Sequence, residues 1–204
     1  MLLDLSLRAT MRNFSTLFLV VFIALAPLHL AYGLVFHDVL ELRELHPAIN
    51  AFPPSRLVRG VGRAALAQAA IWFWILALIE VLAIPVFLRV SRDVLSKDGQ
   101  GEVPTALGAW RSIRQPAEIA IGTITGSRGA AVAGGSLIAI VVGALVQMIG
   151  MTVVDLLPDS VAFAAIPLTQ AAAHSAGAPF FLVALTYALA AAGTAPAERL
   201  PDLF

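Results

Sequence analysis

The chain has 204 residues, of which 59% are hydrophobic and only 13% charged, with thirteen acidic and thirteen basic side chains. Soluble domains are about 45–50% apolar and about 25% charged, so this composition predicts an integral membrane protein. The formal net charge of zero gives no electrostatic basis for nucleic-acid binding, and the absence of cysteine excludes disulfides, thiol catalysis and cysteine-ligated metals.

Four segments are long and apolar enough to cross hydrocarbon about 30 Å thick, which takes roughly 20 helical residues. They are Phe14–Phe36, Ala64–Leu88, Ala131–Val154 and Ser160–Gly193. No small-residue cleavage site follows the first segment before His37, so we expect a retained helix rather than a signal peptide. The fourth is too long for a perpendicular span and contains Pro167 and Pro179. It is either one kinked span or an interfacial piece followed by a span.

Two shorter segments have the composition of amphipathic helices at the membrane surface. Met1–Asn13 mixes leucines with arginines and runs directly into the first span. Thr105–Gln115 begins with a residue that favours the N-cap position and ends before a proline. The polar stretch between the second span and this helix, residues 91–104, is predicted to be a cytoplasmic linker.

A tryptophan beside two arginines suggests how the second short helix meets the membrane. Trp110, Arg111 and Arg114 are expected to anchor it in the headgroup region. The alternative is a solvated cytoplasmic helix with one buried tryptophan.

We therefore predict an all-α integral membrane protein with four transmembrane helices, arranged as two hairpins that are each preceded by an interfacial amphipathic helix. Residues 1–204 form a single polytopic membrane domain, in which 1–97 make up the first half and 103–204 the second.

The distribution of basic residues predicts the orientation in the membrane, because cytoplasmic loops are enriched in lysine and arginine. With the N-terminus inside, nine of the thirteen basic residues lie on the inner side: Arg8, Arg12, Arg89, Arg92, Lys97, Arg111, Arg114, Arg128 and Arg199. The outer side holds Arg43, Arg56, Arg59 and Arg63. We expect a multi-pass protein of a bacterial inner (plasma) membrane with both termini cytoplasmic.

Three stretches resemble a known family. LRATMRNFSTLFLVVFIALAP at the first span, VPTALGAWRSIRQ in mid-chain and FFLVALTY near the end are similar to the integral-membrane domain of bacterial glycerophosphoryl diester phosphodiesterases and its stand-alone relatives. The resemblance implies a multi-helix membrane architecture. It implies no catalytic activity, because the phosphodiesterase domain of the fused proteins is a separate soluble barrel.

Glu80 and Pro85 interrupt the second span and form its main candidate site. An acidic residue inside hydrocarbon costs about 2.5–3.5 kcal/mol on insertion scales, so it normally faces other helices and is paired or protonated. We place Glu80 on the cytoplasmic side of the midplane. Pro85 removes the hydrogen bond to the carbonyl of Val81 and should kink the helix. Structural interhelical hydrogen bonding and a role in proton or cation transport both remain open for Glu80.

Four further polar residues lie within predicted spans: His29, Gln147, Gln170 and His174. Interhelical hydrogen bonds, each contributing about 0.6 kcal/mol, are the expected role, and a ligand site is the alternative.

Small residues recur every four positions along the third span, at Ala131, Gly135, Ala139 and Gly143. We call these four the small-residue stripe. Such spacing lets helix backbones approach closely, and the fourth span offers a matching series of Ala165, Thr169, Ala173 and Gly177. We expect the two spans to pack together, or the stripe to meet a partner.

Outside the spans, His37, Glu41 and Glu44 share one helical face and could ligate a divalent metal. Arg43 lies among them, so a solvated helix extension is the preferred interpretation, and no metal, cofactor or catalytic residue is predicted.

The absence of a recognisable reaction motif favours a non-enzymatic accessory or scaffold subunit that associates with membrane lipids and other membrane proteins. The alternative is a small transporter or channel-like homo-oligomer that uses Glu80 and the proline-kinked helices. A membrane-embedded lipid enzyme is the least favoured class.

Overall fold

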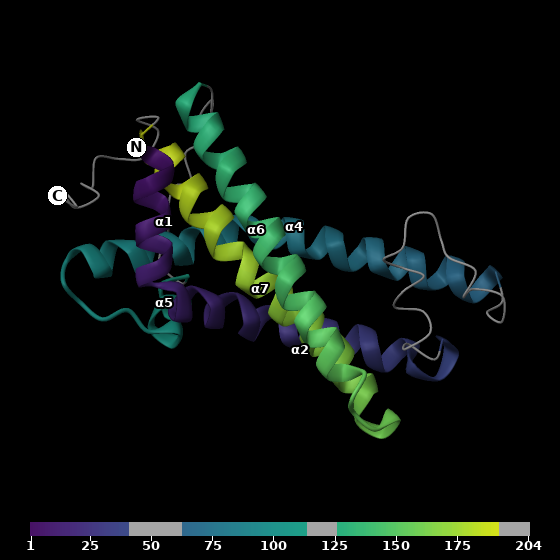
Figure 1. Ribbon diagram of the computed structural model, residues 1–204. Coiled ribbons are helices and arrows are strands. Elements are labelled where there is room, and N and C mark those ends of the chain that lie inside the picture. The colour runs from purple at the N-terminus through teal and green to yellow at the C-terminus, as the bar shows by residue number, and fades with distance from the viewer. Residues whose placement is uncertain (41–62, 114–125, 192–204) are drawn as a thin grey trace.

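The computed structural model describes residues 1–40, 63–113 and 126–191, and every regular element in these ranges is a helix (Figure 1). The helices are α1 (Leu2–Arg12), α2 (Phe14–Leu40), α4 (Arg63–Gly99), α5 (Ala106–Ser112), α6 (Ser127–Val154) and α7 (Asp159–Ala191). Four of them contain a stretch long and apolar enough to cross a membrane: Phe14–Leu34, Ile71–Gly99, Ser127–Val154 and Ala164–Ala190. The prediction of an all-helical, multi-pass membrane protein is therefore confirmed.

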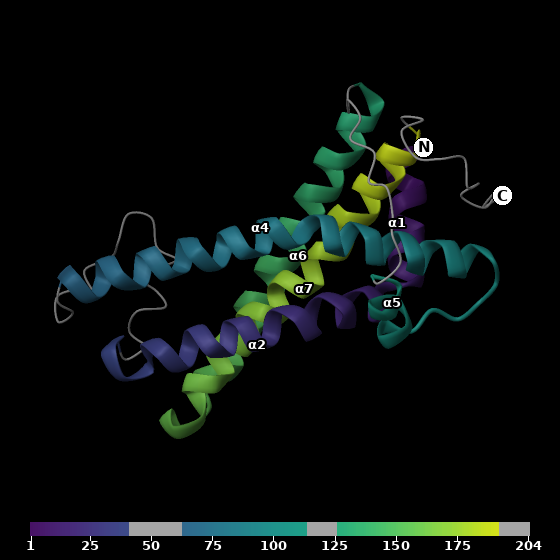
Figure 2. The same ribbon diagram turned by 180° about the vertical axis from the view of Figure 1, so that it is seen from behind.

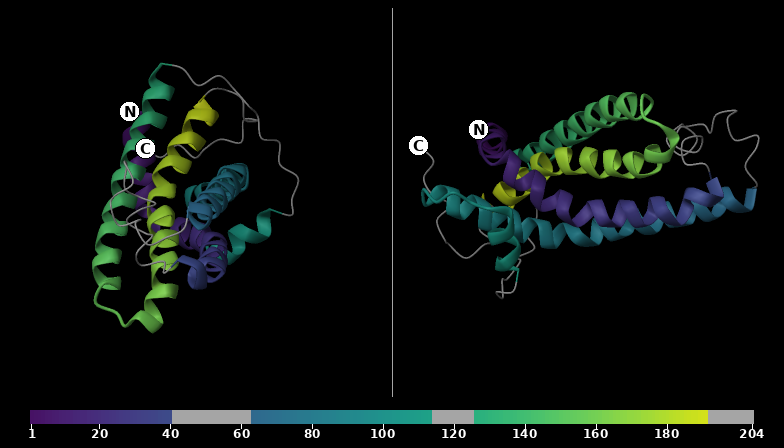
Figure 3. Two further views of the ribbon diagram at one scale, coloured as in Figure 1. Left: turned by 90° about the vertical axis from the view of Figure 1, so that its right-hand side faces the viewer. Right: turned by 90° about the horizontal axis from the view of Figure 1, so that it is seen from below.

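The long helices form two layers of antiparallel pairs. Helices α2 and α4 make one layer, α6 and α7 make the other, and the pairs cross obliquely (Figure 3). Helix α7 is central, since it packs against α1, α2, α4 and α6. It is largely buried, whereas α6 and the first half of α4 leave most of their apolar side chains exposed.

Helix α4 extends well beyond the predicted second span and ends at Gly99. Most of the stretch predicted to be a linker, residues 91–98, is therefore helical. The helix continues because one of its faces remains apolar and buried, with Val90 and Val94 fully buried and Leu95 nearly so. An ion pair one turn apart, Lys97 Nζ to Asp93 Oδ2 at 2.8 Å, also supports this segment. Only the stretch after Gly99 connects α4 to α5.

Helix α7 resolves the two alternatives for the fourth segment, because it is one continuous helix from Asp159 to Ala191. It runs through Pro167 and Pro179, whose side chains are both buried. Helices α2 and α4 likewise continue through Pro27 and Pro85. A transmembrane helix tolerates proline where neighbouring groups satisfy the freed carbonyl.

Helix α1 belongs to the first half of the chain but packs against the α6–α7 pair. Its buried face is made of small and polar residues, Ser6, Ala9 and Thr10. The hydroxyl of Thr10 donates to the Ser6 carbonyl at 2.7 Å, which satisfies it without a partner on another helix. The Leu3 side chain lies close to Gly134 of α6.

Helix α5 makes the reciprocal contact, because it belongs to the second half of the chain but packs against α2 and α4. The indole N–H of Trp110 donates to the Val20 carbonyl of α2 at 3.1 Å, and its ring meets Phe87 of α4 edge-on. Arg89 of α4 donates to the Ser112 carbonyl at 3.1 Å. Thr105 is the N-cap of α5, as predicted. Each short helix thus docks on the helix pair of the other half.

A polar contact joins the start of α2 to the end of α4. The Asp98 carboxylate accepts a hydrogen bond from Asn13 Nδ2 at 2.8 Å and pairs with Arg12. Asn13 is buried and Asp98 nearly so. Charge-assisted hydrogen bonds of this kind are stronger than neutral ones, so the contact fixes the ends of the two helices together.

Helices α6 and α7 pack closely along the small-residue stripe. A Cβ added at Gly135 would lie 2.6 Å from the Ala184 Cβ and 2.7 Å from the Phe180 carbonyl oxygen. A Cβ added at Gly177 of α7 would collide with the Ala139 carbonyl oxygen. The backbones therefore approach to distances that leave no space for a side chain, which is the property that small residues give to membrane helices.

Candidate functional site

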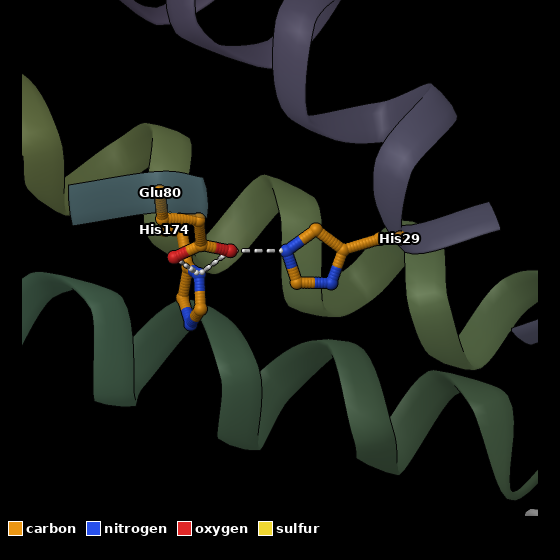
Figure 4. Close-up of side chains that lie close together, drawn as sticks. All are labelled: His29, Glu80 and His174. Carbon is orange, nitrogen blue, oxygen red and sulfur yellow. Dashed lines mark hydrogen bonds and ion pairs between the residues drawn. The ribbon is translucent and has the colours of Figure 1, made fainter. Parts of the chain in front are cut away.

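Three polar side chains from three different helices meet inside the bundle (Figure 4). His29 of α2 and His174 of α7 flank the carboxylate of Glu80 on α4. His29 Nε2 lies 2.8 Å from Glu80 Oε1, and His174 Nδ1 lies 3.1 Å from Oε1 and 3.0 Å from Oε2. We call His29, Glu80 and His174 the polar cluster.

The three residues meet where α2, α4 and α7 pack against one another. His29 lies in Phe14–Leu34, Glu80 in Ile71–Gly99 and His174 in Ala164–Ala190, so each member comes from a different candidate span. The position of Glu80 on the cytoplasmic side of the membrane midplane stays a prediction.

Exposure increases from one member of the polar cluster to the next. The side chain of His29 is 2% exposed, that of Glu80 is 22% exposed and that of His174 is 49% exposed. The two imidazole rings meet edge-on, with centroids 5.2 Å apart. The polar cluster therefore extends from the buried side chain of His29 on α2 to the exposed side chain of His174 on α7, with Glu80 of α4 between them.

The second nitrogen of His29, Nδ1, is buried and has no hydrogen-bond partner among residues 1–40, 63–113 and 126–191. Because Nε2 faces the carboxylate, the neutral ring is expected to carry its hydrogen there and leave Nδ1 as a bare acceptor. A bare lone pair next to a carboxylate–imidazole hydrogen bond is a position that a further proton can occupy.

The arrangement offers two kinds of chemistry. A carboxylate between two imidazoles can share, accept and release protons, since histidine exchanges protons readily near neutral pH. The same groups are metal ligands, and one atom from each residue lies within 4.8 Å of the other two.

Of the six intramembrane polar candidates predicted from the sequence, the structure thus brings together His29, Glu80 and His174. Pro85 lies on an exposed side of α4, and Gln147 and Gln170 are half-buried on α6 and α7. Sequence reasoning identified each member of the polar cluster separately. Their contact was not predicted, because it depends on how α2, α4 and α7 pack against one another.

The remaining predicted positions lie elsewhere in the molecule. Ala131 and Gly135 are buried and Ala139 and Gly143 half-buried between α6 and α7. At the other short helix, Trp110 is half-buried and Arg111 exposed. Arg114, Glu41 and Glu44 fall outside the described residues, and so does the outer metal hypothesis that involved the last two.

No known protein family, curated protein or solved structure matches the chain. The geometry of the polar cluster and the architecture that surrounds it are therefore the features that bear on its function.

Proposed function

We propose that this chain is a small membrane transporter or channel-like protein that moves a proton or another cation by way of the polar cluster. The observation that carries the proposal is the contact of three titratable side chains, from α2, α4 and α7, inside the spans. Ionisable residues within membrane helices mark ion pathways and proton relays more often than sites of simple packing.

A purely structural role explains the polar cluster less well. Removing charged groups from water costs free energy that their mutual attraction only partly offsets, so a buried ion pair stabilises a fold weakly. Neutral amides or hydroxyls would join the helices at lower cost. The other described residues also leave Glu80 and His174 partly uncovered, so one side of the polar cluster is accessible to a proton or cation in this proposal.

In this proposal α2–α4 and α6–α7 are membrane hairpins with both termini cytoplasmic, and α1 and α5 lie at the cytoplasmic surface of a bacterial inner membrane. Helices α1 and α5 and the end of α4 gather at one end of the molecule (Figure 2). These elements carry Arg8, Arg12, Lys97 and Arg111, in keeping with the positive-inside rule. The resemblance to the phosphodiesterase membrane domain is part of the same proposal and concerns the architecture alone.

The orientation is testable with single cysteines, because the chain has none of its own. We expect Gln100→Cys to be protected from an impermeant maleimide in intact cells and Ser55→Cys to be labelled. Both should react after the cells are permeabilised. Labelling of Gln100→Cys alone in intact cells would reverse the threading.

Transport is testable with the purified full chain in liposomes that contain a pH-sensitive dye, with the voltage clamped by potassium and valinomycin. We expect an imposed pH gradient to collapse faster than in protein-free liposomes, or cation uptake to exceed theirs. Liposomes with a denatured preparation of the same chain serve as a second control. If protons, Na⁺, K⁺ and Zn²⁺ all cross the liposomes that contain the protein no faster than they cross protein-free liposomes, the proposal is contradicted.

A second candidate function is that of an accessory or scaffold subunit, and the apolar surface of α6 favours it. Leu137, Ile140, Leu145 and Met148 are all largely exposed on this helix. In a membrane such a surface contacts lipid tails or another membrane protein. Purification in mild detergent, with mass spectrometry of bound proteins and lipids, distinguishes the subunit role from the transport role. A stoichiometric partner protein would support the subunit role if the double variant Leu137→Ser with Ile140→Ser no longer binds it.

A further inference from the structure

The polar cluster contains the donor set of a transition-metal site. Two imidazole nitrogens and one carboxylate are the ligands of many catalytic and transport zinc sites, in which a solvent molecule takes the fourth position. Here the three ligand atoms, His29 Nε2, a Glu80 oxygen and His174 Nδ1, lie within 4.8 Å of one another. In a tetrahedral site with bonds of about 2.0–2.2 Å, ligand atoms are about 3.4 Å apart. Small side-chain rotations therefore suffice.

We propose that the polar cluster binds one divalent cation of the zinc class, with His29, Glu80 and His174 as ligands. The inference rests on the proposed transport function, because it names the cation that competes with protons for the same three groups. In this proposal a solvent molecule takes the fourth position, next to Glu80 and His174, which the other described residues leave partly uncovered.

The chemistry of the donors selects this class of ion. Imidazole nitrogen suits Zn²⁺ and its first-row neighbours, whereas Mg²⁺ and Ca²⁺ require several oxygen ligands. The polar cluster supplies a single carboxylate. Its one negative charge also offsets part of the charge of the cation, which matters inside an apolar bundle.

Binding in this geometry requires a specific change at His29. The metal takes Nε2, the nitrogen that now faces Glu80, so the ring hydrogen must reside on Nδ1. Zinc binding should therefore move the hydrogen of each neutral imidazole from the nitrogen that faces the carboxylate to the other ring nitrogen. Nitrogen NMR of histidine-labelled protein reports this directly, as a metal-bound Nε2 and a protonated Nδ1 at His29.

The test is a titration of the purified full chain in detergent with Zn²⁺, by calorimetry and by metal analysis after dialysis. We expect one Zn²⁺ per chain and no saturable binding of Mg²⁺. Glu80→Gln, His29→Gln and His174→Gln should each weaken Zn²⁺ binding by at least about tenfold, which is the lower range for disturbing a metal site. Thermal melting of each variant shows whether it is folded, and His174→Gln, at the exposed end of the cluster, is the one least expected to disturb packing.

The other two histidines of the chain provide the matched control. His37→Gln with His46→Gln should leave the Zn²⁺ affinity within twofold of the parent, because neither histidine belongs to the proposed ligand set of His29, Glu80 and His174. Loss of Zn²⁺ binding in this control but not in His174→Gln would overturn the assignment. So would the absence of saturable Zn²⁺ binding to the parent.

The Zn²⁺-binding proposal and the transport proposal can fail independently of each other. Proton flux is measured in liposomes that contain a chelator, so flux without Zn²⁺ binding refutes the metal site alone. Saturable Zn²⁺ binding without flux of any cation refutes the transport function alone.

Discussion

Glu80→Gln is expected to fold normally and to lose cation or proton flux to the level of protein-free liposomes. Glutamine has the size of glutamate and can still exchange one hydrogen bond with an imidazole, so the contacts from α2 and α7 persist. It cannot take up or release a proton, and it carries no charge for a cation. The measurement is the initial flux rate in liposomes at equal protein density, together with the thermal midpoint in detergent.

Two further variants separate function from packing at this position. Glu80→Leu should lower stability as well as flux, because it leaves the Nε2 of buried His29 without a partner, at a cost of about 1–3 kcal/mol. Glu102→Gln makes the same chemical change at an exposed position beyond α4 and should leave flux and melting unchanged. A Glu80→Gln variant with full flux would show that the carboxylate serves only to join helices.

Adding a single methyl group at Gly177 is expected to destabilise the bundle by about 1–3 kcal/mol, the usual cost of overpacking. The new Cβ would collide with the Ala139 carbonyl oxygen, a backbone atom that cannot move unless α6 shifts. The loss occurs although alanine is favoured over glycine in a helix by about 1 kcal/mol. Gly177→Leu should prevent the pair from forming and reduce the yield of folded protein. Thermal melting in detergent measures both.

The close contacts form a graded series that tests this explanation. Gly135→Ala should also destabilise, because its Cβ would meet Ala184 and the Phe180 backbone, whereas Gly143→Ala should be nearly neutral, with 3.2 Å to the nearest oxygen. Ala133→Leu, on the exposed side of α6, is the matched control and should be tolerated. Equal melting temperatures for all four variants would mean that α6 and α7 do not pack in this way.

Composition and span length were enough to predict the all-helical class and the number of spans, because few other structures satisfy the backbone in hydrocarbon. They were not enough to find the end of α4. Beyond Leu88 the charged residues mask a buried apolar face formed by Val90 and Val94. A hydropathy pattern averages over all faces of a helix, so it cannot show that one of them remains packed.

The candidate site was predictable in its members but not in its connections. His29, Glu80 and His174 each stand out as a polar residue in an apolar span, whereas their contact depends on the oblique crossing of two helix pairs. The docking of α1 and α5 was also beyond the sequence. An amphipathic pattern is the same whether the apolar face meets lipid or, as for Trp110 against Val20, another helix.

Because α1 and α5 each pack on the helix pair of the other half, the order of synthesis determines when each of them can dock. A chain emerges from the ribosome N-terminus first, so α1 and the α2–α4 pair are made before α6 and α7 provide the surface on which α1 docks. Until α7 arrives, Glu80 lacks His174, and His29 is the one remaining partner that the polar cluster offers it. A nascent chain stopped before α7 therefore holds a half-satisfied carboxylate in the bilayer and an undocked N-terminal helix. Cells degrade chains that remain incompletely folded, so truncation before α7 should lower the cellular amount of the remaining polypeptide.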